Sequence, residues 1–311
     1  MLDAVIMRIK QDGQMKPYAP IQPGVAAAQS MAGARTYVRK GNIEVRLART
    51  FEEILNAQEL RYQIFYGEMN AQPDATMQAT GRDIDPYDEY CDHLLVLDHD
   101  KPEGERVVGT YRLLRQEIAE AQKGFYSAGE YDLSPLMTES FRAQMGEGKQ
   151  LLELGRSCVH EDYRSSATIN LLWQGIAEFL KEYNIAYMFG CASFEGTDPS
   201  GFGEAFSYLY HNYLVPDDFK VKALKKLHVD MDVIPADKLD TRTARRALPP
   251  LIKGYLRLGC FFGDGAVVDE AFGTTDVFIL LPVERVAKRY AKHYDLKNEA
   301  NDTVVAAKLA T

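Results

Sequence analysis

A glutamate and an arginine three residues apart could do acid–base chemistry in the middle of an otherwise apolar segment. The run Leu151–Val159 (LLELGRSCV) predicts a strand buried on at least one face, and it carries Glu153 and Arg156. In a regular strand these two side chains would point to opposite faces. A bulge at Gly155 would bring both towards one cleft, where the carboxylate could act as a general base. The structural alternative is a buried ion pair that contributes little net stability.

The polar turn and the helix after this strand have the geometry of an anion site. Residues 160–166 (HEDYRSS) form the turn. Apolar or small residues then recur at helical spacing, at Leu171, Leu172, Gly175, Ile176, Phe179 and Leu180. Free backbone N–H groups at a helix N-terminus attract phosphates and other anions. We therefore expect an anion to bind at this turn.

An acidic segment, GRDIDPYDEYCDH, could form a second site. Five carboxylates fall within ten positions, at Asp83, Asp85, Asp88, Glu89 and Asp92. On composition alone this pattern favours a solvated loop tip. The other hypothesis is a pocket for a cationic group, because carboxylates hold an ammonium through charge-assisted hydrogen bonds. Ile84 and Tyr87 favour a loop that folds back on the body. Arg61 and Arg112 are expected partners of Glu153 and of these carboxylates.

Composition and motif content argue against several classes of function. The chain has 311 residues, a net charge of −9 and a pI of about 5.3, which argues against nucleic acid as the main partner. The 4 cysteines lie far apart, so we expect free thiols in the cytoplasm, and the 6 histidines lack metal-ligand spacing. Neither a membrane span nor a secretion signal is evident. Dinucleotide-binding, P-loop and serine-hydrolase motifs are missing.

The order of the expected elements favours an α/β (α+β) fold with one mixed sheet and helices on both faces. Strands are expected at 43–48, 94–97, 107–114, 151–159, 186–194 and 277–281. Helices are expected at 51–67, from the turn at 160–166 to about 184, and at 201–213, 249–258 and 283–294. Residues 116–148 resemble an irregular insertion. We expect a flexible leader at 1–42, a single domain at 43–296 and a frayed tail at 297–311.

Several long segments together resemble one enzyme family. They are RYQIFYGEM (61–69), IDPYDEYCDH (84–93), VVGTYRLL (107–114), LELGRSCVHEDYR (152–164) and a later block at 249–282. In this order they resemble bacterial ornithine lipid synthases, in particular L-ornithine Nα-acyltransferases, over about residues 43–294. The succession is also similar to that of acyl-homoserine lactone synthases. Both families have the GNAT acyltransferase fold.

The resemblance implies transfer of a 3-hydroxy fatty acyl group from acyl carrier protein to the α-amino group of L-ornithine, which gives lyso-ornithine lipid. Glu153 and Arg156 would be catalytic. Substrate would contact Arg61, Phe65, Asp85, Asp88, Asp92 and Arg112. No permanently bound cofactor and no metal are expected, since the donor is itself a 4′-phosphopantetheine thioester. Its phosphate would bind at the turn formed by Tyr163, Arg164, Ser165, Ser166, Ala167 and Thr168.

The same resemblance implies partners beyond the small substrate. Acyl carrier proteins are strongly acidic, so basic segments are expected to dock the carrier. The candidates are Lys222, Lys225, Lys226, Arg245 and Arg246. A tyrosine near a later helix, Tyr208 or Tyr210, would protonate the leaving thiolate. A lipid precursor as product is compatible with peripheral contact at the inner membrane, although no anchor is evident.

Three alternatives remain open at this level. One is an acyltransferase of the same fold with glutamine or lysine as acceptor, and another is an acyl-homoserine lactone synthase. The third is a non-catalytic protein that binds a carrier or a membrane surface. Intact Glu153, Arg156, Arg112 and Arg61 argue against the third alternative.

Overall fold

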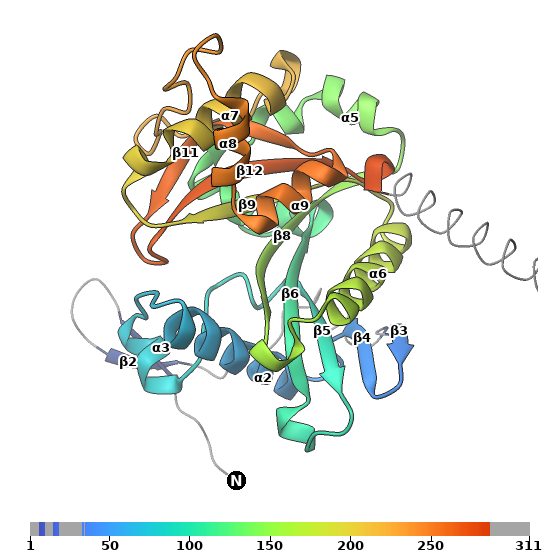
Figure 1. Cartoon of the computed structure of the whole chain (residues 1–311). Coiled ribbons are helices and arrows are strands. Elements are labelled where there is room, and N and C mark those ends of the chain that lie inside the picture. Colours follow the sequence, from blue (N-terminus) through green and yellow to red (C-terminus); the bar gives the residue numbers. More distant parts are fainter. Residues whose placement is uncertain (1–5, 10–14, 19–32, 34, 287–311) are drawn as a thin grey trace, which may run out of the picture.

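One mixed sheet organises the part of the chain that the computed structural model describes, residues 6–9, 15–18, 33 and 35–286 (Figure 1). In this part the sheet has 10 strands. Their spatial order is β3 (Thr36–Lys40), β4 (Ile43–Leu47), β5 (Asp92–Asp98), β6 (Val107–Arg115), β8 (Gln150–Val159), β9 (Ile185–Glu195), β12 (Thr274–Pro282), β11 (Phe261–Asp269), β10 (Lys222–Ala223) and β7 (Tyr131–Asp132). Strands β1 (Ile6–Ile9) and β2 (Met15–Tyr18) pair in a separate antiparallel sheet.

Strand β3 lies inside the stretch for which the sequence predicted a flexible leader. It pairs antiparallel with β4, so the sheet begins at Thr36, ahead of the predicted boundary at residue 42. Because β3 is an edge strand with mostly exposed side chains, it lacks the apolar alternation that marks a buried strand. Most of the predicted leader and the predicted tail at 297–311 lie outside the described residues.

The parallel pair β8–β9 is the place where the sheet opens. In the described structure the two strands pair only from Gln150/Ile185 to Glu153/Phe189. Beyond this point β8 continues along β6 and β9 continues along β12, so the strands diverge and the sheet divides into two halves (Figure 1). At the point of separation, a Cβ added to Gly190 would lie 2.4 Å from the carbonyl oxygen of Leu154. Glycine is required for so close an approach.

Helices cover both faces of the sheet. One face carries α6 (Ser166–Glu182), α7 (Gly203–Tyr213), α8 (Thr241–Ala247) and α9 (Pro250–Leu258) over one hydrophobic cluster. The other face carries α2 (Phe51–Tyr62) and the π-helical turn η1 (Gln63–Glu68) on one half, and α4 (Gln116–Ala121) and α5 (Glu139–Met145) on the other half. The remaining helical pieces are α3 (Ala75–Thr80), η2 (Glu103–Glu105), η3 (Tyr126–Gly129), η4 (Ser134–Met137), η5 (Glu161–Tyr163), η6 (Pro199–Phe202) and η7 (Asp217–Phe219).

Helix α6 follows β8, as predicted. Ser165 caps it by accepting a hydrogen bond from the backbone N–H of Thr168 at 3.2 Å. The buried apolar face of the helix consists of Leu171, Leu172, Ile176, Phe179 and Leu180. Gly175 allows a close approach to β4, because a Cβ there would lie 2.4 Å from Cγ1 of Val45. The helix therefore fixes the polar turn at its N-terminus against the first half of the sheet.

The mixed sheet with helices on both faces is confirmed, but the sequence missed several of its shorter or irregular elements. Strand β11 was missed because Gly263 and Gly265 interrupt its apolar pattern; they lie where its pairing with β12 is bulged. Strands β7 and β10 have 2 residues each, too few to show a period. Helix α8 was also missed. The predicted final helix is seen over residues 283–286, and its remainder lies outside the described chain.

Candidate active site

A cavity of about 330 Å³ lies where β8 and β9 separate. Strands β6 and β8 and the loop before β5 line it from one half of the sheet, and β9, α9 and the β11–β12 hairpin line it from the other. The turns η1 and η3 contribute further wall. Concave sites with a few convergent polar groups are the usual places for a small ligand. The polar groups of this cavity therefore define what it can bind.

Strand β8 has a bulge, one residue after the position considered at Gly155, and the bulge controls the direction of two side chains. Thr110 pairs with Cys158 and Arg112 pairs with Gly155, so Tyr111 faces two residues of β8 instead of one. Arg156 adopts a left-handed conformation with φ of 48° at this place. The extra residue changes the alternation of the strand, and both Glu153 and Arg156 line the cavity as a result.

Glu153 is a buried carboxylate whose hydrogen-bond partners come from the turn η3. The arginines that were its expected partners do not pair with it in the described structure. It accepts hydrogen bonds from the backbone N–H groups of Tyr126 and Ser127, each at 2.7 Å, and from Oγ of Ser127 at 2.5 Å. Burial raises the pKa of Glu153 above its usual value, although these hydrogen bonds favour the ionised form. In the described structure Glu153 and Arg156 form no ion pair with each other, so the structural alternative of a Glu153–Arg156 pair does not hold.

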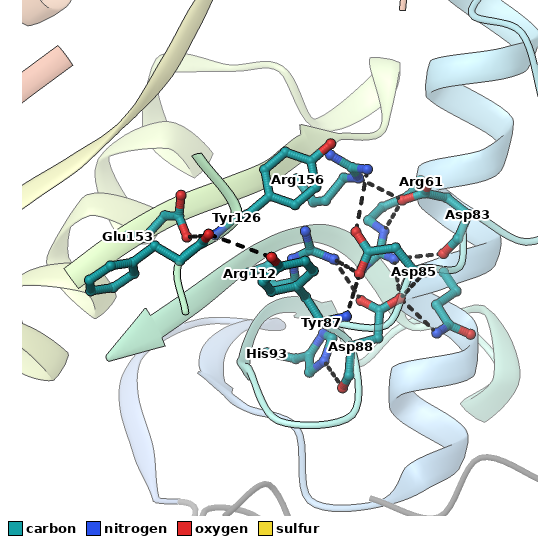
Figure 2. Close-up of polar contacts among 12 residues, drawn as sticks. Arg61, Asp83, Asp85, Tyr87, Asp88, His93, Arg112, Tyr126, Glu153 and Arg156 are labelled. Atoms are coloured by element: carbon teal, nitrogen blue, oxygen red, sulfur yellow. Dashed lines mark hydrogen bonds and ion pairs between the residues drawn. The ribbon is translucent and has the colours of Figure 1, made fainter. Parts of the chain in front are cut away.

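Three arginines instead form a network with the acidic segment, which folds back on the body (Figure 2). Side chains from α2, β6 and β8 alternate with those of the loop. The contacts are Arg61 Nε–Asp83 Oδ2 at 2.7 Å, Arg61 Nη2–Asp88 Oδ2 at 2.8 Å, Arg112 Nη1–Asp85 Oδ1 at 2.6 Å, Arg112 Nη1–Asp88 Oδ1 at 3.2 Å, Arg156 Nε–Asp83 Oδ2 at 3.1 Å and Arg156 Nη2–Asp85 Oδ2 at 3.4 Å. The loop is therefore not the solvated tip that composition alone favoured.

Burial makes this network strongly coupled. Both Arg61 and Asp83 have 0% of their side chains exposed. Burial would raise the pKa of Asp83, but the guanidiniums of Arg61 and Arg156 outweigh that effect and hold it below its usual range. Removing one partner would leave a buried charge without compensation, which typically costs about 3–5 kcal/mol. The network thus holds the loop and positions Arg112 and Arg156 at the cavity wall.

The predicted substrate-binding residues do not all reach the cavity. Phe65 and Arg112 line it. Asp92 instead pairs with Arg115 at 2.8 Å. Asp85 and Asp88 lie behind the wall, where the arginines already match their charge. A direct role of these three aspartates in binding a substrate cation stays a prediction.

A second group of carboxylates, which the sequence reasoning missed, lines the cavity on the other side. Glu130 follows η3, and Asp269 and Asp276 flank the turn of the β11–β12 hairpin. Burial, and then the neighbouring Asp276 and Asp269, raise the pKa of Glu130 to about 7. Burial also raises the pKa of Asp276, which accepts a hydrogen bond from Thr274 Oγ1 at 2.9 Å. The only hint of this group in the sequence is the segment DEAFGTTD (269–276), in which acidic residues stand on both sides of the turn residues.

Four tyrosines line the cavity, Tyr87, Tyr111, Tyr126 and Tyr255, and none of them is a tyrosine suggested from the sequence. Tyr111 of β6 and Tyr255 of α9 line it, and their hydroxyl oxygens are 3.2 Å apart. Burial raises the pKa of both phenols, so they stay protonated and can donate. Tyr208 of α7 is buried elsewhere against Tyr213, with the two hydroxyls 3.1 Å apart.

The predicted donor-binding turn lies at the start of α6 and outside the cavity lining. Ser165, Ser166 and Ala167 are exposed there, with backbone N–H groups of the first helical turn among them. Arg164 is held by Glu68, with Nη2 2.5 Å from the carboxylate, and Tyr163 donates to Asp98. The turn is accessible, and its role as a phosphate site stays a prediction.

The predicted docking residues lie on two separate elements. Lys222 in β10 pairs with Asp264 at 3.1 Å, and Lys225 and Lys226 follow it as exposed residues. Arg245 and Arg246 are exposed on α8, next to the helix that lines the cavity.

No cluster of histidine, cysteine or acidic side chains suited to a metal ion occurs in the described part of the chain. None of the described helices is long and apolar enough to cross a bilayer.

The diverging parallel strands and the cavity between them define an acyltransferase of the GNAT fold, and residues 60–174 match the Acetyltransferase (GNAT) domain family. An L-ornithine N(alpha)-acyltransferase of Brucella abortus (strain 2308) is 48% identical over 258 residues, covering 82% of this chain and 90% of that protein. A protein of the same name from Agrobacterium fabrum (strain C58) is 46% identical over 276 residues, covering 88% and 92%. The chain belongs to the family of L-ornithine N(alpha)-acyltransferases, as the resemblance predicted.

One solved structure with a similar fold is that of FeeM, an N-acyl amino acid synthase from uncultured soil microbes. It is 13% identical to this chain, with a TM-score of 0.41, and the match covers 78% of this chain and 91% of that one.

Proposed function

We propose that this protein transfers a 3-hydroxy fatty acyl group from acyl carrier protein to the α-amino group of L-ornithine, which yields lyso-ornithine lipid. The names of its relatives support ornithine as the acceptor. The observation that carries the chemistry is Glu153, a buried carboxylate on the bulged strand at the cavity wall. Its raised pKa brings its basicity closer to that required of a general base at neutral pH.

The reaction proceeds by direct attack of the amine, without a covalent acyl-enzyme. The α-ammonium gives one proton to Glu153, directly or through water, and the nitrogen then forms a bond to the thioester carbonyl carbon. The C–S bond breaks as the intermediate collapses. Of the two protons that leave the ammonium, one passes through Glu153 to solvent and the other ends on the sulfur. Tyr255, hydrogen bonded to Tyr111 at the cavity wall, is the candidate relay for that second proton.

The divergence of the strands supports stabilisation of the oxyanion. Past Glu153 and Phe189 the two strands no longer pair with each other, so backbone groups of β8 and β9 face the gap. Fixed N–H groups aimed at a developing negative charge lower the barrier without reorganising at the moment of reaction.

The donor enters from the side of α6 and α9. In this proposal the pantetheine phosphate lies at the exposed turn Tyr163–Thr168, where the N-terminus of α6 favours an anion. The acidic carrier docks on basic residues that stand out on a chain of net charge −9. Arg245 and Arg246 on α8 and Lys225 and Lys226 after β10 are the candidates.

Contact with a membrane surface is part of the same proposal. Met69 and Leu251 line the cavity from its two opposite sides, and they are 53% and 59% exposed. Exposed apolar side chains at the mouth of a site suit a product that carries an acyl chain.

The deciding experiment supplies the purified protein with 3-hydroxyacyl carrier protein and, in turn, ornithine, lysine, glutamine and S-adenosylmethionine, and identifies the products by mass. We expect an amide at the α-nitrogen of ornithine. Acyl carrier protein loaded with an acyl chain that lacks the 3-hydroxyl tests whether the enzyme requires that hydroxyl. 3-Hydroxyacyl coenzyme A tests whether it requires the carrier protein. A product formed only from another acceptor would overturn the proposal.

Two variants then test the mechanism and the carrier. Glu153→Gln should lower kcat by about 10²- to 10⁴-fold at saturating donor, whereas Glu139→Gln, an exposed control on α5, should not. Near-normal turnover of Glu153→Gln would exclude it as the base. Charge reversal of Lys225 and Lys226 tests one candidate docking site, and charge reversal of Arg245 and Arg246 tests the other. The variant that disrupts the true docking site should have a raised KM for the carrier. An unchanged KM removes that site from the proposal.

A further inference from the structure

Charged side chains around the cavity fall into two groups that differ in their partners. Every aspartate of the acidic loop that lies near the cavity is matched by an arginine of the chain. Glu130, Asp269 and Asp276, on the opposite side, form no ion pair in the described structure. Buried or half-buried carboxylates are normally paired, because their desolvation is costly. The unmatched group therefore lacks a cation in contact with it, although the charge of Arg156 acts on Asp276 from beyond ion-pair distance.

The members of this group are not equivalent. Asp269 already accepts hydrogen bonds from the backbone N–H groups of Ala271 and Phe272, at 2.9 and 3.0 Å, and so holds the hairpin turn. Glu130 has one weak contact, from Sγ of Cys191 at 3.7 Å. Asp276 is hydrogen bonded to the hydroxyls of Thr274 and Ser193, which leaves further lone pairs of the carboxylate free. Glu130 and Asp276 thus keep capacity for a donor that comes from the cavity.

A chain of contacts links Glu130 to the candidate base and places both within reach of one small ligand. Oγ of Ser127 lies 2.5 Å from Oε1 of Glu153 and 3.9 Å from Sγ of Cys191, which in turn lies 3.7 Å from Oε2 of Glu130. The two carboxylates are therefore neighbours across one cavity wall. The two nitrogens of an α,δ-diamino acid are separated by roughly 6 Å when extended. One nitrogen can reach Glu153 while the other reaches Glu130.

An independent observation points to such a ligand. The relatives at 46–48% identity are named for ornithine, which carries a second ammonium at the end of its side chain. We propose that Glu130 and Asp276 hold the side-chain ammonium of the acceptor amino acid and thereby select a diamino acid with ornithine's spacing. This inference rests on the proposed function and assigns the acceptor's distal amine to the hairpin and η3 side of the cavity. The acidic loop then positions the arginines at the cavity wall and acts on the substrate only through them.

The test compares ornithine with norvaline, which has the same carbon chain and no side-chain ammonium. Wild type, Glu130→Gln, Asp276→Asn and the control Glu270→Gln are assayed for acylation of both amino acids, and binding of both is measured by calorimetry. Glu270 is exposed on the same hairpin and does not line the cavity. Each of the first two variants should raise the KM and Kd for ornithine by about 10- to 100-fold, the range for losing a charged hydrogen bond. Values for norvaline should stay unchanged, and so should all values for the control.

The outcomes separate this inference from the proposed function. If wild type acylates ornithine and both variants keep its KM and its preference over norvaline, the ammonium site is wrong while the function stands. If wild type binds ornithine without acylating it, the function fails and the Kd values still decide the ammonium site. Absence of both binding and acylation overturns both proposals. Because either variant can be judged alone, one that fails to fold leaves the other as the test.

Discussion

Replacing Glu130 by glutamine should make the ligand-free protein more stable in a pH-dependent way. In the folded protein the pKa of Glu130 is about 7, against a usual value of 4.5, because of burial and the nearby Asp276 and Asp269. Between these two values the folded state keeps a proton that the unfolded chain has lost. The stability contributed by this group is therefore present at low pH and falls as the pH rises towards 7.

The size of the effect follows from the pKa values. Each pKa unit corresponds to about 1.4 kcal/mol, so linkage predicts that the stability advantage of Glu130→Gln grows by about 2 kcal/mol between pH 5.5 and 8. Partial exposure of the side chain reduces this to about 1–2 kcal/mol. The comparison between two pH values cancels the constant difference between glutamate and glutamine in packing.

Urea unfolding of wild type and variant at both pH values measures this difference directly. Glu270→Gln, which removes the same charge from an exposed position on the hairpin, should show no such growth. Saturating ornithine should shrink the advantage of the variant, since the ligand binds wild type more tightly and stabilises it more. An advantage that is equal at both pH values, or smaller at pH 8, would refute the assignment of a raised pKa to Glu130.

Three further predictions concern the scaffold and the base. Arg61→Met should destabilise the fold by about 3–5 kcal/mol, measured by urea unfolding, because buried Asp83 and Asp88 each lose one of their two guanidinium partners. Gly190→Ala should cost about 1–3 kcal/mol and lower turnover, since the new Cβ would lie 2.4 Å from the carbonyl oxygen of Leu154; a fully active, equally stable variant would contradict the close contact. The acidic limb of the pH profile of kcat/KM should rise with pH through a pKa above the usual glutamate value, and vanish in Glu153→Asn.

The bulge in β8 shows how far local sequence reasoning can go. A glycine between a glutamate and an arginine in an apolar strand indicated a break in the alternation, and the structure has it one residue further on, at Arg156. Strand positions and helix ends near apolar periodic runs were likewise accessible, because periodicity is a local property. The functional pairing of Glu153 was not accessible, since its partners Tyr126 and Ser127 come from the irregular insertion.

The charges show where such reasoning ends. Composition marked the loop 83–92 as acidic, but only the fold shows that three arginines from three different elements neutralise its aspartates. Glu130 and Asp276 are far apart in sequence, and the acids around the hairpin turn give no local indication that Glu130 lies beside them. Their shared cavity depends on how the hairpin and η3 meet across the open sheet.

The open junction between β8 and β9 also separates what must stay constant from what can vary. The base and the bulge belong to β8, whose backbone is fixed by its pairing with β6. The proposed ammonium site belongs to a 3-10 turn in an insertion and to a hairpin on the opposite half. Changes at Glu130, which follows η3, and in the hairpin can alter the preferred acceptor while Tyr126 and Ser127 keep holding Glu153. Acceptor specificity is therefore an evolvable trait of this fold, carried by parts that can be exchanged around a constant reaction centre.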